Sequence, residues 1–371
     1  MRQTITLSQN EREIFDVVRN ADGIQRSQLH TMVPLTQPSV YRITDNLVEK
    51  ELLLLGKSKA NGPGKPSPEL RINPSRYYAV GVVVNTDAIS ICIANLACEV
   101  VESRHIVGQS HHLKNALTLI QNAINDMLQA IPGKTSPEVA GICFSVSGFF
   151  SGKRMSPPLP LHEWADVDLE AVLSRVFDEP IYLENNATSS AIGESLIGVG
   201  RWARTFAYLS FNYGFGGGII LDGKPFRGSH GNAMEIGTIY DSSVAHRRPA
   251  LASLLRLLQS NGIDIETIEE LRSRFDPAWP GVEAWVADVL PQLNLAIWAI
   301  RGTFDPEVIV LGGEIPESLA QIFIERVSIY TDIKPRYGIH MPAPGIVFTE
   351  VPDANIALGA AITPLKAQFF P

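Results

Sequence analysis

The chain has 371 residues, of which 45% are hydrophobic, and its formal net charge is −8. This length predicts two or three domains with sizeable buried cores. No stretch approaches the roughly 18 consecutive apolar residues of a membrane helix, and residues 1–10 lack the basic and apolar regions of a secretory signal, so we expect a cytoplasmic protein outside the membrane.

The charge is distributed unevenly along the chain. Residues 1–73 hold ten Lys or Arg and eight Asp or Glu, a net of +2, whereas residues 74–371 hold 21 and 31, a net of −10. The first segment can therefore approach phosphate although the whole chain is acidic. Cys92, Cys98 and Cys143 are odd in number and scattered, which indicates reduced, buried thiols.

The first seventy residues predict three short helices. Residues 8–20 form the first, because Ser8 and Glu11 have the spacing of a capping box. Residues 26–32 predict a short second helix. Thr36 is expected to cap a third helix that begins at Gln37, followed by a proline that the first turn tolerates.

The third helix has the pattern of a recognition helix. Its inner face is apolar: Val40, Ile43, Leu47 and Val48. Polar side chains are expected to face outward near its start, where a helix entering the major groove reads bases: Gln37, Ser39, Tyr41 and Arg42.

Residues 52–72 then predict two strands around a basic, Gly- and Pro-rich loop that contains Lys57, Lys59 and Lys65. Such a loop suits phosphate or minor-groove contact. The segment 1–73 is thus predicted to be a winged helix-turn-helix domain that binds double-stranded DNA. The alternative is a helical protein-interaction module with a solvated loop.

The remaining residues, 74–371, predict a repeated α/β pattern. Strands are expected at residues 77–84, 89–96, 100–107 and 139–146, with a helix at 113–130. A similar hairpin returns at residues 205–212 and 218–221, and a later strand at 308–311. Two halves that open alike indicate a duplication around a cleft, which is a common place for a ligand site.

Three stretches of the body carry a recognisable pattern: LENNAT at residues 183–188 running on to Gly193 and Glu194, NYGFGGGII at 212–220, and GSHGNAMEIG at 228–237. In order and spacing they resemble the ROK family of repressors, open reading frames and sugar kinases. The resemblance implies a two-lobed, actin-like ATPase (ribonuclease H-like) fold. The lobes are expected to split near residues 185–205, with a C-terminal segment returning to the first lobe. The N-terminal module is similar to the family's regulator branch.

The resemblance also implies how the kinase members work, and this chain departs from it twice. The first phosphate cradle of the kinases, Asp-x-Gly-Gly-Thr, corresponds here to residues 83–87, where Val83 replaces the acid and both glycines are absent. Asp87 could serve as a metal ligand in a shifted register, or simply as a turn residue. The catalytic base position is Asn186, whose amide cannot take a proton. The glycine loop 214–218 is intact, which fits either nucleotide binding or a tight hairpin.

By the same resemblance, ligand contacts are expected at Asn185, Asn186 and Glu235, whose amides and carboxylate suit sugar hydroxyls. The family's zinc site needs a histidine and three cysteines, but Thr238 stands at the histidine position and no Cys follows it, so we expect no metal, with His246 at the surface or in the pocket. Met234 replaces a usual glycine and is expected to narrow the pocket.

The sequence therefore predicts a transcriptional regulator, most simply a repressor of carbohydrate genes, that senses a sugar or sugar derivative, lacks kinase activity, needs no cofactor and forms a homodimer or homotetramer. Two alternatives stay open: an active sugar kinase with an accessory DNA-binding module, and a repressor that needs no ligand. Neither the effector nor the operator follows from the sequence.

Overall fold

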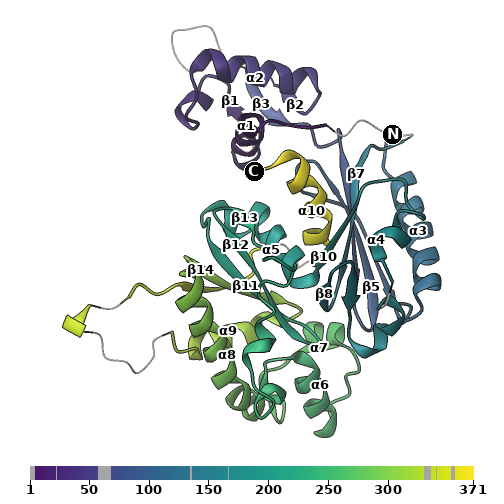
Figure 1. Cartoon of the computed structure of the whole chain (residues 1–371), viewed down its shortest axis with the longest axis vertical. Coiled ribbons are helices and arrows are strands. Elements are labelled where there is room, and N and C mark those ends of the chain that lie inside the picture. Colours follow the sequence, from purple (N-terminus) through teal and green to yellow (C-terminus); the bar gives the residue numbers. More distant parts are fainter. Residues whose placement is uncertain are drawn as a thin grey trace.

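The N-terminal unit combines short helices with a small sheet. The structure is a computed structural model that describes residues 5–21, 23–56, 68–133, 136–165, 167–329, 336–339, 341–351 and 356–371. Its first elements are α1 (Gln9–Asn20), η1 (Leu29–Thr31) and α2 (Gln37–Glu49), beside a sheet of order β1-β3-β2 made of Ile24–Gln25, Glu69–Ile72 and Leu53–Leu55 (Figure 1). The first and third predicted helices are confirmed, and both halves of the Ser8–Glu11 capping box form.

The predicted second helix at residues 26–32 is wrong in extent, because the described chain forms only the single 3₁₀ turn η1 there. The Thr31 hydroxyl donates to the carbonyl of Gln28 at 2.7 Å, and Nδ1 of His30 lies 2.6 Å from the carbonyl of Ser27. Such local side-chain bonds compete with helical ones. Met32, the last residue of the predicted helix, is 57% exposed.

The first lobe of the body is built on a five-stranded sheet of order β10-β7-β4-β5-β6. Its strands are β4 (Tyr78–Val84), β5 (Ala88–Asn95), β6 (Val100–Val107), β7 (Val139–Val146) and β10 (Ile181–Asn185). The lobe also contains α3 (Leu113–Gln129), the hairpin β8 (Phe149–Ser151) with β9 (Arg154–Ser156), η2 (Leu159–Trp164) and α4 (Leu169–Leu173). The strands predicted at 77–84, 89–96, 100–107 and 139–146 are confirmed to within a residue.

The second lobe repeats this topology. Its sheet has the order β13-β12-β11-β14-β15, with strands β11 (Phe206–Phe211), β12 (Phe215–Leu221), β13 (Lys224–Pro225), β14 (Val308–Gly313) and β15 (Gly345–Phe348). In each sheet the first strand pairs antiparallel with the second and parallel with the fourth. The predicted duplication is confirmed by these matching orders. The helical elements of this part are η3 (Val199–Arg201), η4 (Ile236–Ile239), η5 (Ala245–Arg247), α6 (Leu251–Ser260), α7 (Ile268–Arg274), α8 (Val282–Phe304), α9 (Glu317–Arg326) and η6 (Arg336–Gly338).

Two helices exchange between the lobes. α5 (Asn186–Ile197) follows β10 of the first sheet and packs on β12 of the second, whereas α10 (Ile356–Phe369) lies beyond β15 and packs on β4 and β7 of the first sheet. The helices cross closely, since a Cβ added to Gly193 would lie 2.9 Å from the Cα of Gly359. This exchange is the arrangement expected of an actin-like fold. No helix in the described ranges is long and apolar enough to cross a membrane.

Candidate functional site

Asn185, Asn186 and Glu235 line one cavity between the lobes, with a volume of about 140 Å³. We call this cavity the amide pocket. Its other polar lining includes Asn85 after β4, Ser147 after β7 and Asn212 after β11. The pocket thus lies where several strands of both sheets end. This is where ligands bind in open α/β sheets.

Asn186 is the buried centre of a hydrogen-bond network. Its Oδ1 accepts from Oγ of Ser145 at 2.8 Å, and its Nδ2 donates to Oδ1 of Asn85 and to Oγ of Ser147, both at 2.9 Å. Both amide hydrogens are therefore engaged by protein atoms. What this side chain can still offer a ligand is the second lone pair of its oxygen.

Asn185 connects the two lobes at the start of α5. Its Oδ1 caps the helix by accepting from the backbone N–H of Ala187 at 2.8 Å. Its Nδ2 donates to the carbonyl of Gly148 at 2.6 Å and, at 3.3 Å, to Oε1 of Glu235. Burial raises the pKa of Glu235 above its ordinary value. Among the described residues that line the amide pocket, Glu235 is the one that carries a charge.

The segment that carries Glu235 is held by contacts to the first lobe that the sequence did not indicate. Arg227 donates through Nε to Oε1 of the buried Glu184 at 2.7 Å. Burial raises the pKa of Glu184, and Arg227 opposes the rise. The Asn232 amide both accepts from the N–H and donates to the carbonyl of Phe150, each at 2.7 Å. These contacts fix the position of Glu235 relative to α5.

Met234 adopts a left-handed backbone conformation, with φ of 67°, which is uncommon for a residue with a side chain. Its side chain packs toward β12, since a Cβ added to Gly217 would lie 2.9 Å from its Cε. Met234 does not belong to the residues that line the amide pocket. The expectation that it narrows the pocket is therefore wrong.

The glycines of the loop at residues 214–218 differ in how closely they are packed. A Cβ on Gly218 would lie 2.7 Å from the carbonyl oxygen of Ala187 in α5, whereas one on Gly214 would meet nothing within 4 Å. Close approach of β12 to α5 and to Met234 thus explains Gly217 and Gly218. Of the two interpretations of the loop, the tight hairpin accounts for these glycines without a nucleotide.

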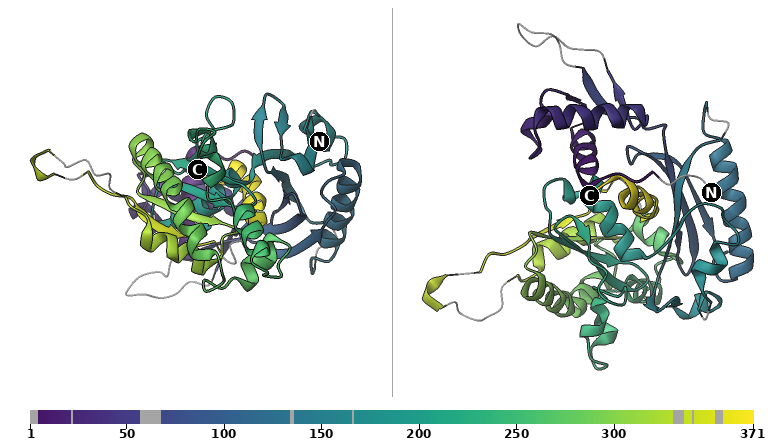
Figure 2. Two further views of the ribbon diagram at one scale, coloured as in Figure 1. Left: turned by 90° about the horizontal axis from the view of Figure 1, so that it is seen from below. Right: turned by 45° about the horizontal axis from the view of Figure 1, so that its top comes forward.

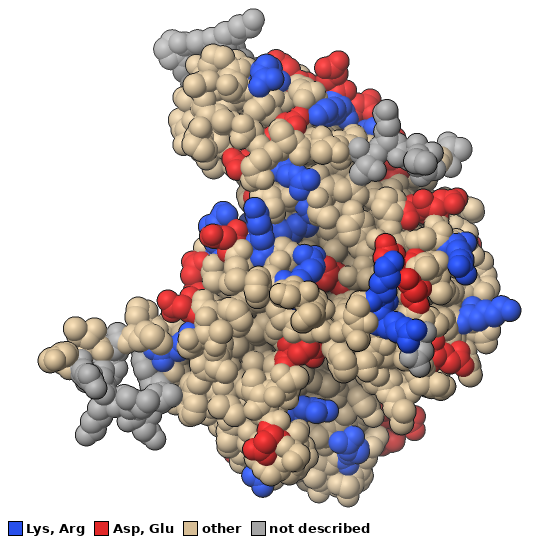
Figure 3. All heavy atoms as spheres, in the orientation of Figure 1, with Lys and Arg blue, Asp and Glu red and all other residues tan. Residues whose placement is uncertain are grey.

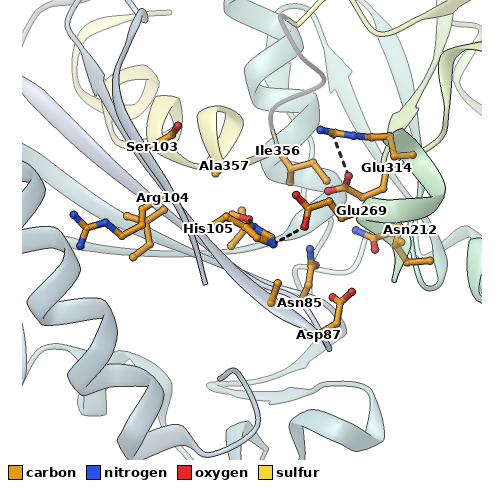
Figure 4. A pocket seen from close by; sticks show the side chains of 16 residues that line it. Asn85, Asp87, Ser103, Arg104, His105, Asn212, Glu269, Glu314, Ile356 and Ala357 are labelled. Carbon is orange, nitrogen blue, oxygen red and sulfur yellow. Dashed lines mark hydrogen bonds and ion pairs between the residues drawn. The ribbon is translucent and has the colours of Figure 1, made fainter. Parts of the chain in front are cut away.

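A second cavity of about 300 Å³ lies between the lobes and shares Asn85 and Asn212 with the amide pocket. We call it the charged cleft, and Figure 4 shows its ion pairs. His105 of β6 and Glu269 of α7 approach to 3.1 Å across the lobes, and Arg272 lies 3.2 Å from Glu314. Burial raises the pKa of Glu314, which Arg272 counteracts and nearby Asp87 reinforces. Asp87 also lines this cleft.

The predicted DNA-contacting residues of α2 lie on its first half. Gln37 and Arg42 are exposed, and Ser39 and Tyr41 are half-buried. Nε2 of Gln37 donates to the Tyr41 hydroxyl at 3.2 Å. Thr36 stands at the expected N-cap position but its side chain accepts no cap bond; its hydroxyl donates to Oγ of Ser39 at 3.0 Å.

One residue missed from the sequence, Arg26, holds α2 in place: its guanidinium stacks 4.5 Å from the Tyr41 ring and pairs with Asp45 at 2.6 Å. Lys57, Lys59 and Lys65 lie outside the described residues.

The potential metal ligands are dispersed. His246 is exposed in η5. Cys92, Cys98 and Cys143 are free and buried, and burial raises the pKa of all three thiols. In the part of the chain that is described, no three His, Cys, Asp or Glu residues are grouped so that they could hold a metal ion.

Comparisons with known proteins place this site in context. Residues 79–247 match the model of the ROK family. The xylose repressor of Caldicellulosiruptor bescii is 25% identical over 335 residues, which cover 82% of each chain. An uncharacterized protein of Sinorhizobium fredii is 27% identical over 98% of this chain and 92% of its own.

Solved structures share the fold. A ROK family transcriptional regulator described as a homologue of the Escherichia coli MLC protein superposes with a TM-score of 0.65 and 17% identity, over 97% of this chain and 96% of its own. A ROK family glucokinase from Streptomyces griseus, in complex with glucose and AMPPNP, gives 0.61 and 17%, over 76% and 98%. Both regulators and kinases therefore have this fold, and the repressor relatives support the regulator branch.

Proposed function

We propose that this chain, which carries a ROK family domain, is a DNA-binding transcriptional repressor that senses a neutral monosaccharide in the amide pocket and has no kinase activity. The observation that carries the proposal is the convergence of Asn185, Asn186 and Glu235 on one cavity at the start of α5. The xylose repressors among its relatives support a sugar-responsive repressor.

The DNA-binding part of the proposal rests on the N-terminal unit. Residues 1–73 would form a winged helix-turn-helix domain, and residues 74–371 the body that binds ligand and associates with a second copy. α2 exposes Gln37 and Arg42 at the end expected to enter the major groove. Two such domains in a homodimer would fit the two halves of a two-fold operator.

The chemistry of the amide pocket favours a neutral sugar. The cavity of about 140 Å³ is lined mainly by uncharged polar groups, which can exchange hydrogen bonds with the hydroxyls of a sugar ring. Glu235 can accept hydrogen bonds from hydroxyls, and Nδ2 of Asn212, which is buried without a hydrogen-bond partner in the described structure, can donate one. A phosphate or carboxylate would meet Glu235, and the described lining residues include no cation to offset its charge.

Three features argue against phosphoryl transfer, which depends on positioning and charge neutralisation. The Asn186 amide has no basic site and is already hydrogen-bonded. Val83, at the position of the kinase acid, is 1% exposed and belongs to the core. The charged cleft, finally, combines three acids with Arg104, His105 and Arg272, so it offers the phosphates of a nucleotide no excess of positive charge. These features support a chain without kinase activity.

A direct test begins with the DNA. A duplex selected from a random pool serves as the operator, and its affinity is measured by fluorescence anisotropy with and without D-xylose, D-glucose, D-mannose or N-acetylglucosamine. We expect one neutral sugar to change the operator Kd, and Glu235→Gln to weaken that sugar's binding. Sugar-dependent ADP release from ATP would establish the kinase alternative. DNA binding that no sugar changes would favour the ligand-independent repressor.

A further inference from the structure

The segment 367–371 is packed into the core of the N-terminal unit, far from it in sequence. Phe369 and Phe370 are both fully buried. The Phe370 ring stacks on Phe15 of α1, with centroids 5.3 Å apart, and Phe369 lies 5.1 Å from the ring of Tyr77. Figure 1 and the right-hand view of Figure 2 show α1 beside the end of α10. One continuous hydrophobic core therefore joins α1 to the first lobe.

Two arginines of α1 add directional contacts to the ends of both exchanged helices. Nη1 of Arg12 donates to the carbonyls of Ala367 at 2.9 Å and Phe370 at 3.1 Å. Arg19 donates to the carbonyl of Leu196 near the end of α5, and its guanidinium lies 5.3 Å from the centre of the Phe370 ring. Lys and Arg side chains gather around this junction on the face shown in Figure 3. The N-terminal unit thus contacts α5 and α10 together.

The opposite end of α5 lies at the amide pocket. Asn185 caps the helix and Asn186 is its first residue, so both expected ligand contacts are fixed to its start. At 12 residues and 1.5 Å of rise per residue, the helix spans about 18 Å. About two thirds of the way along, Gly193 brings the backbone of α5 into close contact with Gly359 of α10. A packed helix of this kind moves as a rigid body.

We propose that α1 and the segment 367–371 form a clasp through which ligand in the amide pocket sets the orientation of the N-terminal unit. The clasp is defined by Arg12, Arg19 and Phe15 on one side and by Leu196 and residues 367–371 on the other. A sugar that changes the angle between the lobes moves α5 and α10, and the clasp carries that movement to α1. This inference rests on the proposed function and names its coupling element.

The alternative is that the N-terminal unit is connected to the body only through the linker of residues 73–77, between β3 and β4. A short linker limits the distance between two units but does not define their relative orientation. Within the clasp, Arg12 and Arg19 act as positioning residues, since neither lines the amide pocket and neither belongs to the predicted DNA-contacting set. Their loss should leave both binding reactions intact and remove the link between them.

The test compares the full-length double variant Arg12→Gln/Arg19→Gln with the wild type. A matched control, Arg326→Gln, removes an exposed arginine of α9 that pairs with Glu283. Three quantities are measured: the operator Kd, the sugar Kd by calorimetry for whichever panel sugar acts on the wild type, and the fold-change in operator Kd at saturating sugar. Hydrogen exchange of the α1 amides reports whether the clasp has opened.

We expect the double variant to keep each Kd within about threefold, to exchange faster in α1, and to lose the sugar-induced change in operator Kd, which is typically about 5–150-fold for coupled sites. The control should behave as the wild type. If the α1 amides of the double variant exchange faster but sugar still changes its operator Kd by the wild-type factor, the clasp inference is overturned and the proposed function is not. A wild type whose DNA binding ignores every panel sugar overturns the proposed function as well. If the double variant does not fold, Phe370→Leu, which loses the stacking on Phe15, provides the same comparison.

Discussion

Replacing Asn186 with Asp is the most informative single change, because it restores the acid of the kinase pattern in a site built around an amide. The wild-type Nδ2 donates to Asn85 and Ser147, and a carboxylate oxygen cannot donate. The Ser147 hydroxyl can turn and donate instead. The Asn85 amide must rotate to present its Nδ2, and the new charge is buried at a residue that is 5% exposed.

The expected cost follows from this network. Asn186→Asp inverts two buried hydrogen bonds of about 0.5–1.5 kcal/mol each and buries a charge in a cavity whose lining holds no cation. We expect a loss of about 1–3 kcal/mol, which lowers the melting temperature by about 2–4 °C for each kcal/mol in a unit of 150–250 residues. Asn186→Ala should cost at least as much, since Ser145, Ser147 and Asn85 each lose a hydrogen bond.

Differential scanning fluorimetry measures the stability change, and a coupled ADP-release assay over the sugar panel measures catalysis. We expect no turnover from Asn186→Asp, because Val83 and Asn85 still occupy the first cradle. Restoring that cradle with Val83→Asp, Asn85→Gly and Thr86→Gly in addition is the change that could recover some turnover. An unchanged melting temperature for Asn186→Asp would contradict the hydrogen-bond network described around Asn186. Turnover near the 1–100 s⁻¹ typical of kinases, in the single variant or the wild type, would refute the kinase-inactive assignment.

Further predictions concern ligand, packing and DNA. Because burial raises the pKa of Glu235 above its ordinary 4.5, sugar affinity should fall on acidification beginning above pH 4.5, and calorimetry of Glu235→Gln should show weak binding without that dependence. The raised pKa also means that ionised Glu235 destabilises the fold as pH rises. Gly218→Ala should destabilise by about 1–3 kcal/mol through its clash with the Ala187 carbonyl, whereas Gly214→Ala should be nearly neutral in thermal unfolding. Arg42→Ala should weaken operator binding by about 1–3 kcal/mol if Arg42 reads a base, and an unchanged anisotropy titration would remove it from the interface.

Elements specified by local chemistry could be predicted closely. The first helix begins where the Ser8–Glu11 capping box puts it, and the strand at residues 100–107 has the predicted limits. Elements that depend on distant partners could not. β1 is two residues long and exists because Ile24 pairs with Leu70. The second helix was overextended because propensity does not reveal the local bonds made by residues such as Thr31.

The residues of the candidate site also divide into those that a local sequence pattern predicts and those that depend on distant segments. The motif pattern identified Asn185, Asn186 and Glu235, and the fold brings them to one cavity. Asn85 and Asn212 were not predicted as site residues, although Asn212 opens the stretch at 212–220 and Asn85 stands where the kinases have glycine. Their place in the pocket follows from the meeting of the strand ends, which the sequence does not show. The direction of the Met234 side chain could not be predicted, since it follows from a left-handed backbone.

The division of the interlobe space into two cavities bears on how a regulator of this kind would respond to one ligand. The amide bridge between Asn85 and Asn186 lies where the two cavities share their wall. On the far side, the lobes are joined by His105 and Glu269, whose side chains are 39% and 61% exposed. A contact this exposed contributes about 0–1 kcal/mol, so the lobes depend mainly on the bonds from Arg227 to Glu184 and from Asn232 to Phe150. A sugar that contacts Asn185 on one lobe and Glu235 on the other would shift the lobe equilibrium by its preference for one arrangement, and a tenfold preference corresponds to about 1.4 kcal/mol.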